Sequence, residues 1–292
     1  MGMSFGSYAS RVVATKVVAT DGTGDFTDIQ AGINALPATG GGVYIKEGTY
    51  VITSNITFPN SNISLIGCGK STKIQYTFVG FGMNINGVNG IRIQNLYLLG
   101  NNVGFQQGIR VFNSNETIVD HCWIEATGDT GIGVSGNSNR CIFSNNIIHN
   151  MDYYGLQLLQ CNHIVVTGNV ISSSGSDALQ LGTPAGNCDY LLFSGNVIKD
   201  AVSKGIRLSD GDHCVFSNNQ IYNNGDDGVF VDVGCDYNVI TSNVIISNGT
   251  YGVNISNVSC DKNIIVANDL SGNTSGGITD SGTLTEIGHN VT

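Results

Sequence analysis

The chain has 292 residues, of which 22 are acidic and 12 are basic, and its formal net charge at pH 7 is −10. So few basic residues form no cationic stripe for a phosphate backbone, which excludes nucleic acid from the expected partners. No apolar run is long enough to span a bilayer as a helix. Residues 1–13 lack the apolar core of a secretion signal, and the sequence leaves open whether a signal was removed.

A unit of about two dozen residues recurs from near residue 80 to near residue 280. Each copy begins with a small, an apolar, a variable and a second apolar residue, as in residues 108–111 (Gly-Ile-Arg-Val) and 131–134 (Gly-Ile-Gly-Val). The first of these copies is 23 residues from the second, and the longest unit, 178–204, has 27 residues. A fixed period of this size indicates a solenoid, in which each unit forms one coil.

The second half of each unit reads apolar, apolar, Ser or Thr, small, Asn, any, apolar, as in residues 142–148 and 165–171. Short alternating runs of β-branched residues, separated by Gly, Asn and Ser, predict strands and turns rather than helices. Stacked Asn side chains can hydrogen-bond from coil to coil. The Asn recurs at Asn95, Asn146, Asn169, Asn196, Asn219, Asn243 and Asn268, with Cys122 in its place once. These features predict an all-β fold, a parallel β-helix.

This pattern resembles the right-handed parallel β-helices of the pectate-lyase-like superfamily over most of the chain. Residues 19–36 and 40–50 are similar to the start of pectin methylesterases and related enzymes. The resemblance implies one β-helix domain over residues 1–292, with a capping strand and helix in 1–40, coils in 41–282 and a C-terminal tail in 283–292. Many chemistries and several non-enzymes share this scaffold, so the fold alone does not give the activity.

Eight cysteines raise the question of disulfides or a metal site. Cys161, Cys188, Cys235 and Cys260 each stand four residues before the first apolar residue of the next strand. One cysteine per coil at a repeated turn predicts a row of inward-facing thiols, because free Cys packs as a small hydrophobe. The sequence contains no Cys-x-x-Cys metal pair. We therefore expect all eight to be reduced in the folded protein.

The variable residue between the two apolar ones must point outward, because alternate strand side chains face opposite sides. Coils lie about 4.8 Å apart, so residues one period apart are surface neighbours. The predicted outward row is Asn84, Arg110, Gly133, Gln157, Gln180, Arg207, Phe230, Asn254 and Thr279. The residues just before the small position form a second row, Gln107, Thr130, Tyr154, Asp177, Lys204, Asp227 and Tyr251. One residue earlier is a third row, Gln106, Asp129, Tyr153, Ser176, Ser203, Asp226 and Thr250, and a fourth holds Glu125, His149, Ser172, Lys199 and Tyr222.

Titratable and aromatic side chains gather in these rows between about residues 129 and 232, which suits a polar, hydroxyl-rich ligand. The alternative is that outward residues are polar because they are solvated. The longest unit holds extra residues around Thr183-Pro184-Ala185-Gly186, which we expect to project as a loop beside a continuous groove. The predicted sugar-binding residues are Tyr153, Gln157, Gln180 and Arg110.

The order Asp177, Lys204, Asp227 in the second row favours a protonated lysine, since nearby carboxylates stabilise its charged form. Lys204 thus suits an ion-pair ladder or the neutralisation of a substrate carboxylate, and Arg207 can bind a carboxylate through two parallel hydrogen bonds. Asp177, Asp226 and Asp227 can instead hold Ca²⁺ through oxygen ligands. The expected cofactor is either none or calcium.

Residues 149–155 (His-Asn-Met-Asp-Tyr-Tyr-Gly) resemble a motif of mannuronan C-5 epimerases, Asp-Pro-His-Gly with a Tyr three residues before the Asp. Tyr and His are exchanged between the two positions. The resemblance implies that Tyr154 and His149 act as base and acid at C5 of a uronate, that Asp152 orients them, and that a cation neutralises the carboxylate. Polygalacturonases share the Asp pair of residues 225–228, but the His of their motif is missing here, which puts inverting hydrolysis in doubt.

The sequence thus predicts a carbohydrate-active protein that modifies a uronate-containing polysaccharide by C5 proton abstraction, as a lyase or a C-5 epimerase. The predicted catalytic residues are His149, Asp152, Tyr154, Lys204 and Arg207. A non-catalytic surface, spike or adhesion β-helix that binds glycans is the alternative, and a glycoside hydrolase using Asp177, Asp226 and Asp227 is the third candidate. The expected partner is an acidic polysaccharide, and the expected location is outside the cell or at its surface.

Overall fold

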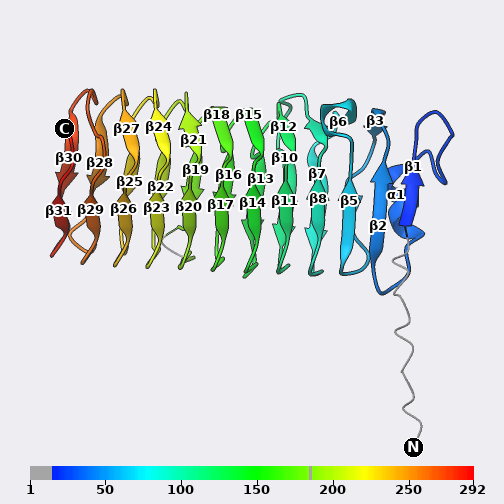
Figure 1. Ribbon diagram of the computed structural model, residues 1–292, viewed down its shortest axis with the longest axis horizontal. Coiled ribbons are helices and arrows are strands. Elements are labelled where there is room, and N and C mark those ends of the chain that lie inside the picture. Colours follow the sequence, from blue (N-terminus) through cyan, green and yellow to red (C-terminus); the bar gives the residue numbers. More distant parts are fainter. Residues whose placement is uncertain (1–14, 184–185) are drawn as a thin grey trace, which may run out of the picture.

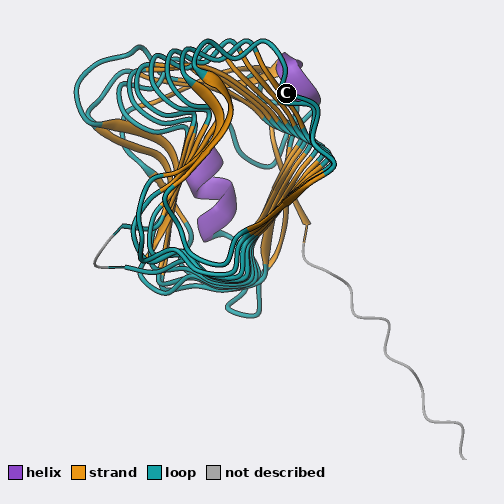
Figure 2. Ribbon diagram, turned by 90° about the vertical axis from the view of Figure 1, so that its left-hand side faces the viewer, coloured by secondary structure: helices purple, strands orange, loops and turns teal. Residues whose placement is uncertain are grey.

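A computed structural model of the protein describes residues 15–183 and 186–292. Within these residues the chain winds into a parallel β-helix, and its coils are stacked along one long axis (Figure 1). Each full coil passes through three parallel sheets, which surround a common core (Figure 2). No helix in the described part of the chain is long and apolar enough to cross a membrane.

The three sheets are named here in the order in which each coil enters them. Sheet 1 consists of β1 (Thr15–Val18), β2 (Gly41–Ile45), β5 (Ile63–Ile66), β8 (Arg92–Gln94), β11 (Ile118–Asp120), β14 (Ile142–Ser144), β17 (Val165–Thr167), β20 (Leu192–Ser194), β23 (Val215–Ser217), β26 (Val239–Thr241), β29 (Ile264–Val266) and β31 (Glu286–Gly288). Sheet 2 consists of β3 (Gly48–Ile52), β6 (Thr72–Tyr76), β9 (Tyr97–Leu99), β12 (Trp123–Glu125), β15 (Ile147–Met151), β18 (Val170–Ser174), β21 (Val197–Lys199), β24 (Gln220–Tyr222) and β27 (Val244–Ile246).

Sheet 3 carries the outward row described below. It consists of β4 (Ile56–Thr57), β7 (Gly80–Asn86), β10 (Gln106–Phe112), β13 (Ile132–Ser135), β16 (Leu156–Leu158), β19 (Leu179–Leu181), β22 (Ile206–Leu208), β25 (Val229–Val231), β28 (Tyr251–Ile255) and β30 (Gly276–Asp280). Its strands are parallel and pair coil by coil. Residues one repeat apart therefore lie side by side on this face.

The N-terminal cap has the elements that the resemblance implies. β1 pairs in parallel with β2, and α1 (Ile29–Asn34) lies at the open end of the first coil (Figures 1 and 2). Asp28 precedes the helix, and its Oδ1 accepts the Ala31 N–H at 2.7 Å, which satisfies one of the free donors of the first turn. Ile29 and Ile33 are buried, so the helix closes the core with its apolar side.

Inward-facing apolar side chains fill the space between the sheets. Ile109 and Val111, which flank one outward position, are both 0% exposed, and the same alternation recurs in each coil. The rings of Phe193 and Phe216 stack with their centroids 5.2 Å apart. Burial of one such side chain contributes about 1.5–3 kcal/mol, so this stacked core is the main source of stability.

A row of buried Asn side chains follows sheet 1. The backbone N–H and the Nδ2 of Asn146 both donate to Asn169 Oδ1, at 2.9 and 3.0 Å, and the same two bonds link each later member to the next. The row is Asn146, Asn169, Asn196, Asn219, Asn243, Asn268 and Asn290, of which only Asn290 is half-buried. The predicted ladder is confirmed except at Asn95. Because Gln94 pairs with Asp120, buried Leu96 takes the row position and Asn95 is exposed.

The cysteines are packed thiols, as predicted. All eight are free, seven are buried, and Cys68 is half-buried. Cys161, Cys188, Cys235 and Cys260 are 0% exposed, and the sulfur atoms of Cys161 and Cys188 lie 3.5 Å apart without a bond. Burial raises the pKa of the Cys122, Cys141 and Cys214 thiols, so these three stay protonated at neutral pH.

Residues 283–292 correct one expectation. They were expected to form a tail, but β31 pairs in parallel with β29, and Val291 forms a further bridge to Asp269. Asn290 also extends the Asn row. The backbone groups at the open edge of β29 need partners, and another partial coil supplies them.

Candidate functional site

The outward face of sheet 3 carries the predicted row of variable residues. Arg110 lies opposite Asn84 on one side and Gly133 on the other, and Gln157 lies between Gly133 and Gln180. Arg207, Phe230, Asn254 and Thr279 continue the row in register. The Nε2 of Gln157 donates to Gln180 Oε1 at 2.6 Å, so neighbouring members contact each other. The predicted row is confirmed.

The second and third predicted rows lie where the strands of sheet 3 begin. Their backbones are linked from coil to coil, as in the bond of 3.0 Å from the Ser176 N–H to the Tyr153 carbonyl. Several of their side chains are covered rather than open. Asp177 and Asp227 are 4% and 3% exposed, so these two carboxylates belong to the framework more than to the surface.

The fourth predicted row lies on a different sheet. His149 pairs with Glu125 and Ser172 in sheet 2, and its Nδ1 lies 3.0 Å from Ser172 Oγ. Tyr154 lies beyond the following turn, directly before sheet 3, and Asp152 in that turn is exposed. His149, which was predicted to form an acid–base pair with Tyr154, therefore lies in sheet 2, whereas Tyr154 lies in the connection that leads to sheet 3.

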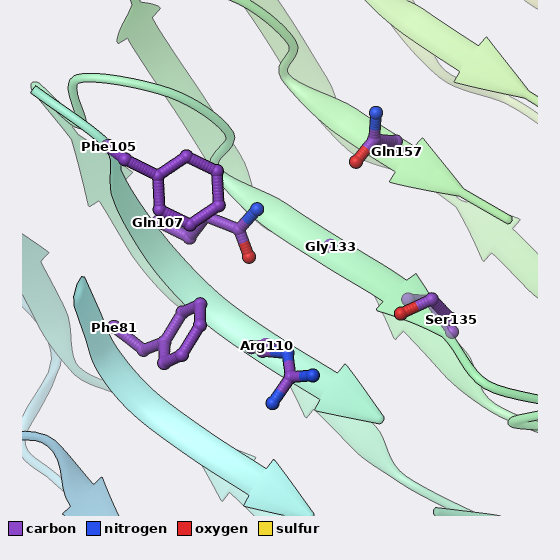
Figure 3. Close-up of a pocket in the computed structure, with 8 residues that line it drawn as sticks. Phe81, Phe105, Gln107, Arg110, Gly133, Ser135 and Gln157 are labelled. Carbon is purple, nitrogen blue, oxygen red and sulfur yellow. The ribbon is translucent and has the colours of Figure 1, made fainter. Parts of the chain in front are cut away.

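A hollow of about 190 Å³ lies on the outward face of sheet 3, over β7, β10, β13 and β16 (Figure 3). Its lining includes Phe81, Phe105, Gln107, Arg110, Gly133, Ser135 and Gln157. In Figure 3 the two phenylalanines and Arg110 lie on one side of the Gly133 strand and Gln157 lies on the other. Of the predicted binding residues, Arg110 and Gln157 line this hollow. Its volume is below the roughly 300–1,000 Å³ of pockets for larger ligands and suits a single small ring.

Arg110 is the cation of the hollow. Its guanidinium carbon lies 5.0 Å from the ring centroid of Phe81 and 4.3 Å from that of Phe112. Its Nη1 donates to Asn84 Oδ1 at 3.3 Å. The ion pairs within residues 15–183 and 186–292 do not include Arg110. Burial lowers its pKa, but the group stays charged at neutral pH. A guanidinium held between rings and without a carboxylate partner can bind a ligand carboxylate.

Asp129 borders the hollow through Gln107. Gln107 Nε2 donates to Asp129 Oδ2 at 2.9 Å. Burial raises the pKa of Asp129, and the hydrogen bond from Gln107 opposes this shift. A half-buried carboxyl group with a raised pKa beside a hollow is a candidate for proton transfer. Asp129 belongs to the predicted third row but was not among the predicted site residues.

Two neighbouring tyrosines lie one coil beyond Gly133. Tyr153 is 55% exposed, Tyr154 is half-buried, and their ring centroids are 6.0 Å apart. Burial raises the pKa of Tyr154, and the negative charge of Asp177 raises it further. The phenol is therefore protonated at neutral pH. Tyr154 is suited to donate a proton rather than to act as a base.

The two cations predicted to neutralise a substrate are already paired. Lys204 Nζ donates to Asp226 Oδ2 and lies 4.8 Å from the centroid of the Phe230 ring. Arg207 Nη2 donates to Asp232 Oδ2 at 2.8 Å. Arg207 Nε is buried and has no hydrogen-bond partner among the described residues. Lys204 thus pairs with the third row, and not with the carboxylates of its own row as expected.

The carboxylates predicted as calcium ligands are Asp177, Asp226 and Asp227. Each accepts hydrogen bonds from the protein, since Asp177 Oδ1 accepts the Lys204 N–H at 3.1 Å and Asp227 Oδ2 accepts Asn254 Nδ2 at 2.9 Å. In the described part of the chain, no group of three or more His, Cys, Asp or Glu side chains is arranged to hold a metal ion. Calcium binding stays a prediction without a converging ligand set.

The predicted loop begins after β19. Thr183 and Gly186 exchange two backbone hydrogen bonds of 3.2 and 2.9 Å. Pro184 and Ala185, on which the predicted projection depends, lie outside the described residues. Thr183 and Gly186 follow the C-terminal end of β19, whereas the two tyrosines precede the N-terminal end of β16. The predicted loop and the tyrosines therefore adjoin opposite ends of the sheet 3 strands.

Sequence reasoning missed Phe81, Phe105 and Asp129 as site residues. Phe81 lies opposite Gln107 in the register of β7 and β10, so it belongs to the second row one coil earlier than the series began. A signal was present nevertheless. Gly133 is the one residue without a side chain in an outward row of long or polar residues, and such a gap marks a hollow.

The sequence of residues 40–189 and of residues 130–291 matches the family described as "Right handed beta helix region". The chain belongs to this family. Two curated relatives from Arabidopsis thaliana match part of it. Pectinesterase/pectinesterase inhibitor 18 is 29% identical over 137 residues, which are 41% of this chain and 24% of the relative. Probable pectinesterase 56 is 28% identical over 143 residues, 42% of this chain and 48% of the relative. The matched region thus spans about a quarter to a half of these relatives.

Solved structures share the fold at low sequence identity. The A-module of mannuronan C-5 epimerase AlgE4 from Azotobacter vinelandii has a TM-score of 0.67 at 18% identity, covering 90% of this chain and 93% of the module. ORF18 of Geobacillus virus E2 has a TM-score of 0.76 at 17% identity, covering 94% and 60%. An alginate lyase from Paenibacillus sp. has a TM-score of 0.64 at 16% identity, covering 95% and 99%. The parallel β-helix predicted from the repeat and the right-handed form implied by the resemblance are both confirmed.

Proposed function

We propose that the protein modifies a uronate-containing polysaccharide, which lies along the outward face of sheet 3, by removing the proton at C5. One observation carries the proposal. Arg110, which has no ion pair among the described residues, lines the hollow over Gly133. The half-buried carboxyl group of Asp129 is hydrogen-bonded to Gln107 of the same lining, and the protonated phenol of Tyr154 lies one coil further along, before β16. The fold similarity to a C-5 epimerase and to an alginate lyase supports the same class of substrate.

Each group has a separate role in the proposed reaction. Arg110 binds the uronate carboxylate and stabilises the negative charge that develops when the C5–H bond breaks. Asp129 accepts the C5 proton, and its raised pKa makes it a stronger base than an ordinary aspartate. The electron pair of the broken bond is delocalised into the carboxylate.

Tyr154 completes the reaction in either of two ways. In a lyase, the electron pair re-forms as a C4–C5 double bond, the C4–O4 bond breaks, and Tyr154 gives its proton to the leaving oxygen. In an epimerase, Tyr154 returns a proton to C5 from the opposite face. His149 and Asp152 have no role in this scheme because of their place on sheet 2 and in the turn.

The remaining predicted residues extend the binding face. Gln157, Gln180 and Tyr153 supply amides and an exposed ring for further sugar units. Arg207 is a secondary anchor for a more distant carboxylate, weakened by its ion pair with Asp232. Because the substrate is a polymer of the cell exterior, we place the activity outside the cell or at its surface.

A non-catalytic glycan-binding protein is the second candidate. Lys204 and Arg207 form ion pairs with Asp226 and Asp232. The net charge of −10 also disfavours strong binding of a polyanion. The structure of tailspike protein 2 from a bacteriophage also shares the fold, with a TM-score of 0.67 at 13% identity, covering 88% of this chain and 39% of the tailspike. These three observations fit a β-helix that binds sugars without altering them.

Incubation of the purified protein with alginate and with polygalacturonate tests the proposal. Ultraviolet absorbance detects unsaturated chain ends from a lyase, and NMR detects inverted units from an epimerase. New reducing ends without unsaturation would instead identify a hydrolase. Binding without any chemical change would favour the second candidate, and neither binding nor change would refute both.

A further inference from the structure

Gly133 stands out among the outward-facing residues of sheet 3. Its neighbours in the row, Arg110 and Gln157, carry long side chains. Gly133 lies inside β13, and its φ is not in the positive range where glycine is required. The backbone therefore tolerates other residues at this position. The physical consequence of the glycine is the space above it.

A side chain at this position would change the hollow in two ways. An added Cβ would lie 3.1 Å from Gln107 Oε1, so the amide of Gln107 would have to shift by a few tenths of an ångström. That amide holds Asp129 through a bond of 2.9 Å. Any longer side chain would also occupy the hollow itself, which Gly133 helps to line.

We infer that Gly133 is the specificity-determining residue of this face, because it opens a subsite for one uronate ring whose carboxylate contacts Arg110. This inference rests on the proposed function and names the part of the polymer that the face recognises. Phe81 and Phe105 offer apolar surface to the ring, and the Gln107–Asp129 pair lies beside it. The polymer is thereby held in one register, with a single charged unit seated at β13.

The inference also states which ligands are rejected. A neutral sugar of the same shape leaves the guanidinium of Arg110 without an anionic partner. A uronate whose carboxylate is esterified loses the same charge-assisted hydrogen bonds. Free acidic oligosaccharides should therefore bind more tightly than their methyl esters, although the ring and the linkage are identical.

The test compares binding of acidic oligosaccharides from polygalacturonate and alginate to the parent and to three variants, by calorimetry. Gly133→Gln introduces the residue type that the next two coils carry at the equivalent position, Gln157 and Gln180, so the strand accommodates it. Gly133→Ala is the milder version. Thr279→Gln adds the same side chain to the same row at β30, far from the hollow, and is the matched control.

We expect Gly133→Gln to weaken binding by at least about tenfold, Gly133→Ala to weaken it less, and Thr279→Gln to leave it unchanged. In turnover assays the effect of Gly133→Ala should fall on KM more than on kcat. Thermal unfolding of each variant shows whether the fold is kept, and if Gly133→Gln does not fold, Gly133→Ala decides. Full-strength binding by a folded Gly133→Gln variant would overturn this inference alone. Absence of any acidic-oligosaccharide binding by the parent would overturn the proposed function and this inference with it.

Discussion

The two halves of the outward face of sheet 3 carry similar side chains and use them differently. In the C-terminal half, Lys204 and Arg207 are paired with Asp226 and Asp232. In the N-terminal half, Arg110 lies against aromatic rings beside a hollow, and the described residues supply it with no ion pair. The C-terminal half has the greater density of charge, but the N-terminal half has the greater capacity to bind a charged ligand.

The difference shows how a solenoid separates framework from site. Side chains one coil apart are about 4.8 Å apart, so opposite charges in adjacent coils neutralise each other along the stack. A ligand can then compete only where this pairing is interrupted. Gly133 interrupts it, since it leaves Arg110 and Gln157 on either side of an unfilled position.

The largest expected effect concerns Tyr154, which lies between the two halves. Tyr154→Phe should lower kcat by about 10²–10⁴-fold, because it removes the hydroxyl group that donates the proton in the proposed reaction. Oligosaccharide affinity should change little, since the ring remains. Tyr222→Phe, in β24 of sheet 2, is the matched control and should retain turnover. Undiminished kcat in Tyr154→Phe would place the proton donor elsewhere.

The two arginines test the comparison directly. Arg110→Ala should lower kcat/KM by about 10²-fold, because the developing negative charge loses its preorganised partner. Arg207→Ala should cost no more than about fivefold, the size expected for a residue engaged in a partly exposed ion pair. Steady-state kinetics on the same oligosaccharide measures both. Equal losses in the two variants would break the distinction between the halves.

A variant in the buried ladder gives the scale of a purely structural effect. Asn196→Leu leaves the amide partners of the adjacent coils unsatisfied and should lower the free energy of unfolding by about 1–3 kcal/mol. Denaturant unfolding measures this change. Oligosaccharide affinity below the unfolding midpoint should match that of the parent, because the ladder lies away from sheet 3. A variant as stable as the parent would contradict the burial of the row.

The smallest expected effect is a difference in pH dependence between the halves. Burial disfavours ionisation of Asp226, but hydrogen bonds from Lys204 and Thr250 outweigh it and lower its pKa from 3.8. This carboxylate therefore contributes stability above its ordinary pKa, and the contribution is lost as pH falls through the lowered value. Burial raises the pKa of Asp129, so stability falls as pH rises from the ordinary value through the raised one.

Two variants separate these contributions. Asp226→Asn should reduce the loss of stability that occurs as the pH falls. Asp129→Asn should remove the loss of stability that occurs as the pH rises above the ordinary aspartate pKa. Denaturant midpoints measured from about pH 2 to pH 6 sample both sides of the ordinary aspartate pKa. Identical pH profiles for the two variants would show that neither carboxyl group titrates in its own environment.

Much of the architecture could be predicted from the repeat. The spacing of the apolar pairs gave the strands, and the alternation within each strand gave the outward row from Asn84 to Thr279 in the correct register. The error at Asn95 has a local cause. The motif around Leu96 has no asparagine at the ladder position, and the neighbouring Asn95 lies one residue out of register with the row.

The site was predicted less well, because the predictions rested on the chemical type of each residue and not on its burial or its neighbours in the fold. Lys204 and Arg207 were chosen for their charge, and the structure pairs both. His149 and Tyr154 are five residues apart, but His149 is in β15 of sheet 2 and Tyr154 lies beyond the turn that leads to β16 of sheet 3. Asp129 was overlooked because its distinguishing property, burial beside a hollow, does not show in the sequence.

The sequence by itself determined the coil, because a solenoid is built from local contacts between consecutive repeats and its period fixes which residues are neighbours. It also determined which side chains face out, since strand alternation admits two choices and the apolar residues select one. The tertiary structure alone decided which charges are free. That outcome depends on side chains of adjacent coils reaching or missing each other, as Arg207 reaches Asp232 and as Gly133 leaves Arg110 beside an open hollow.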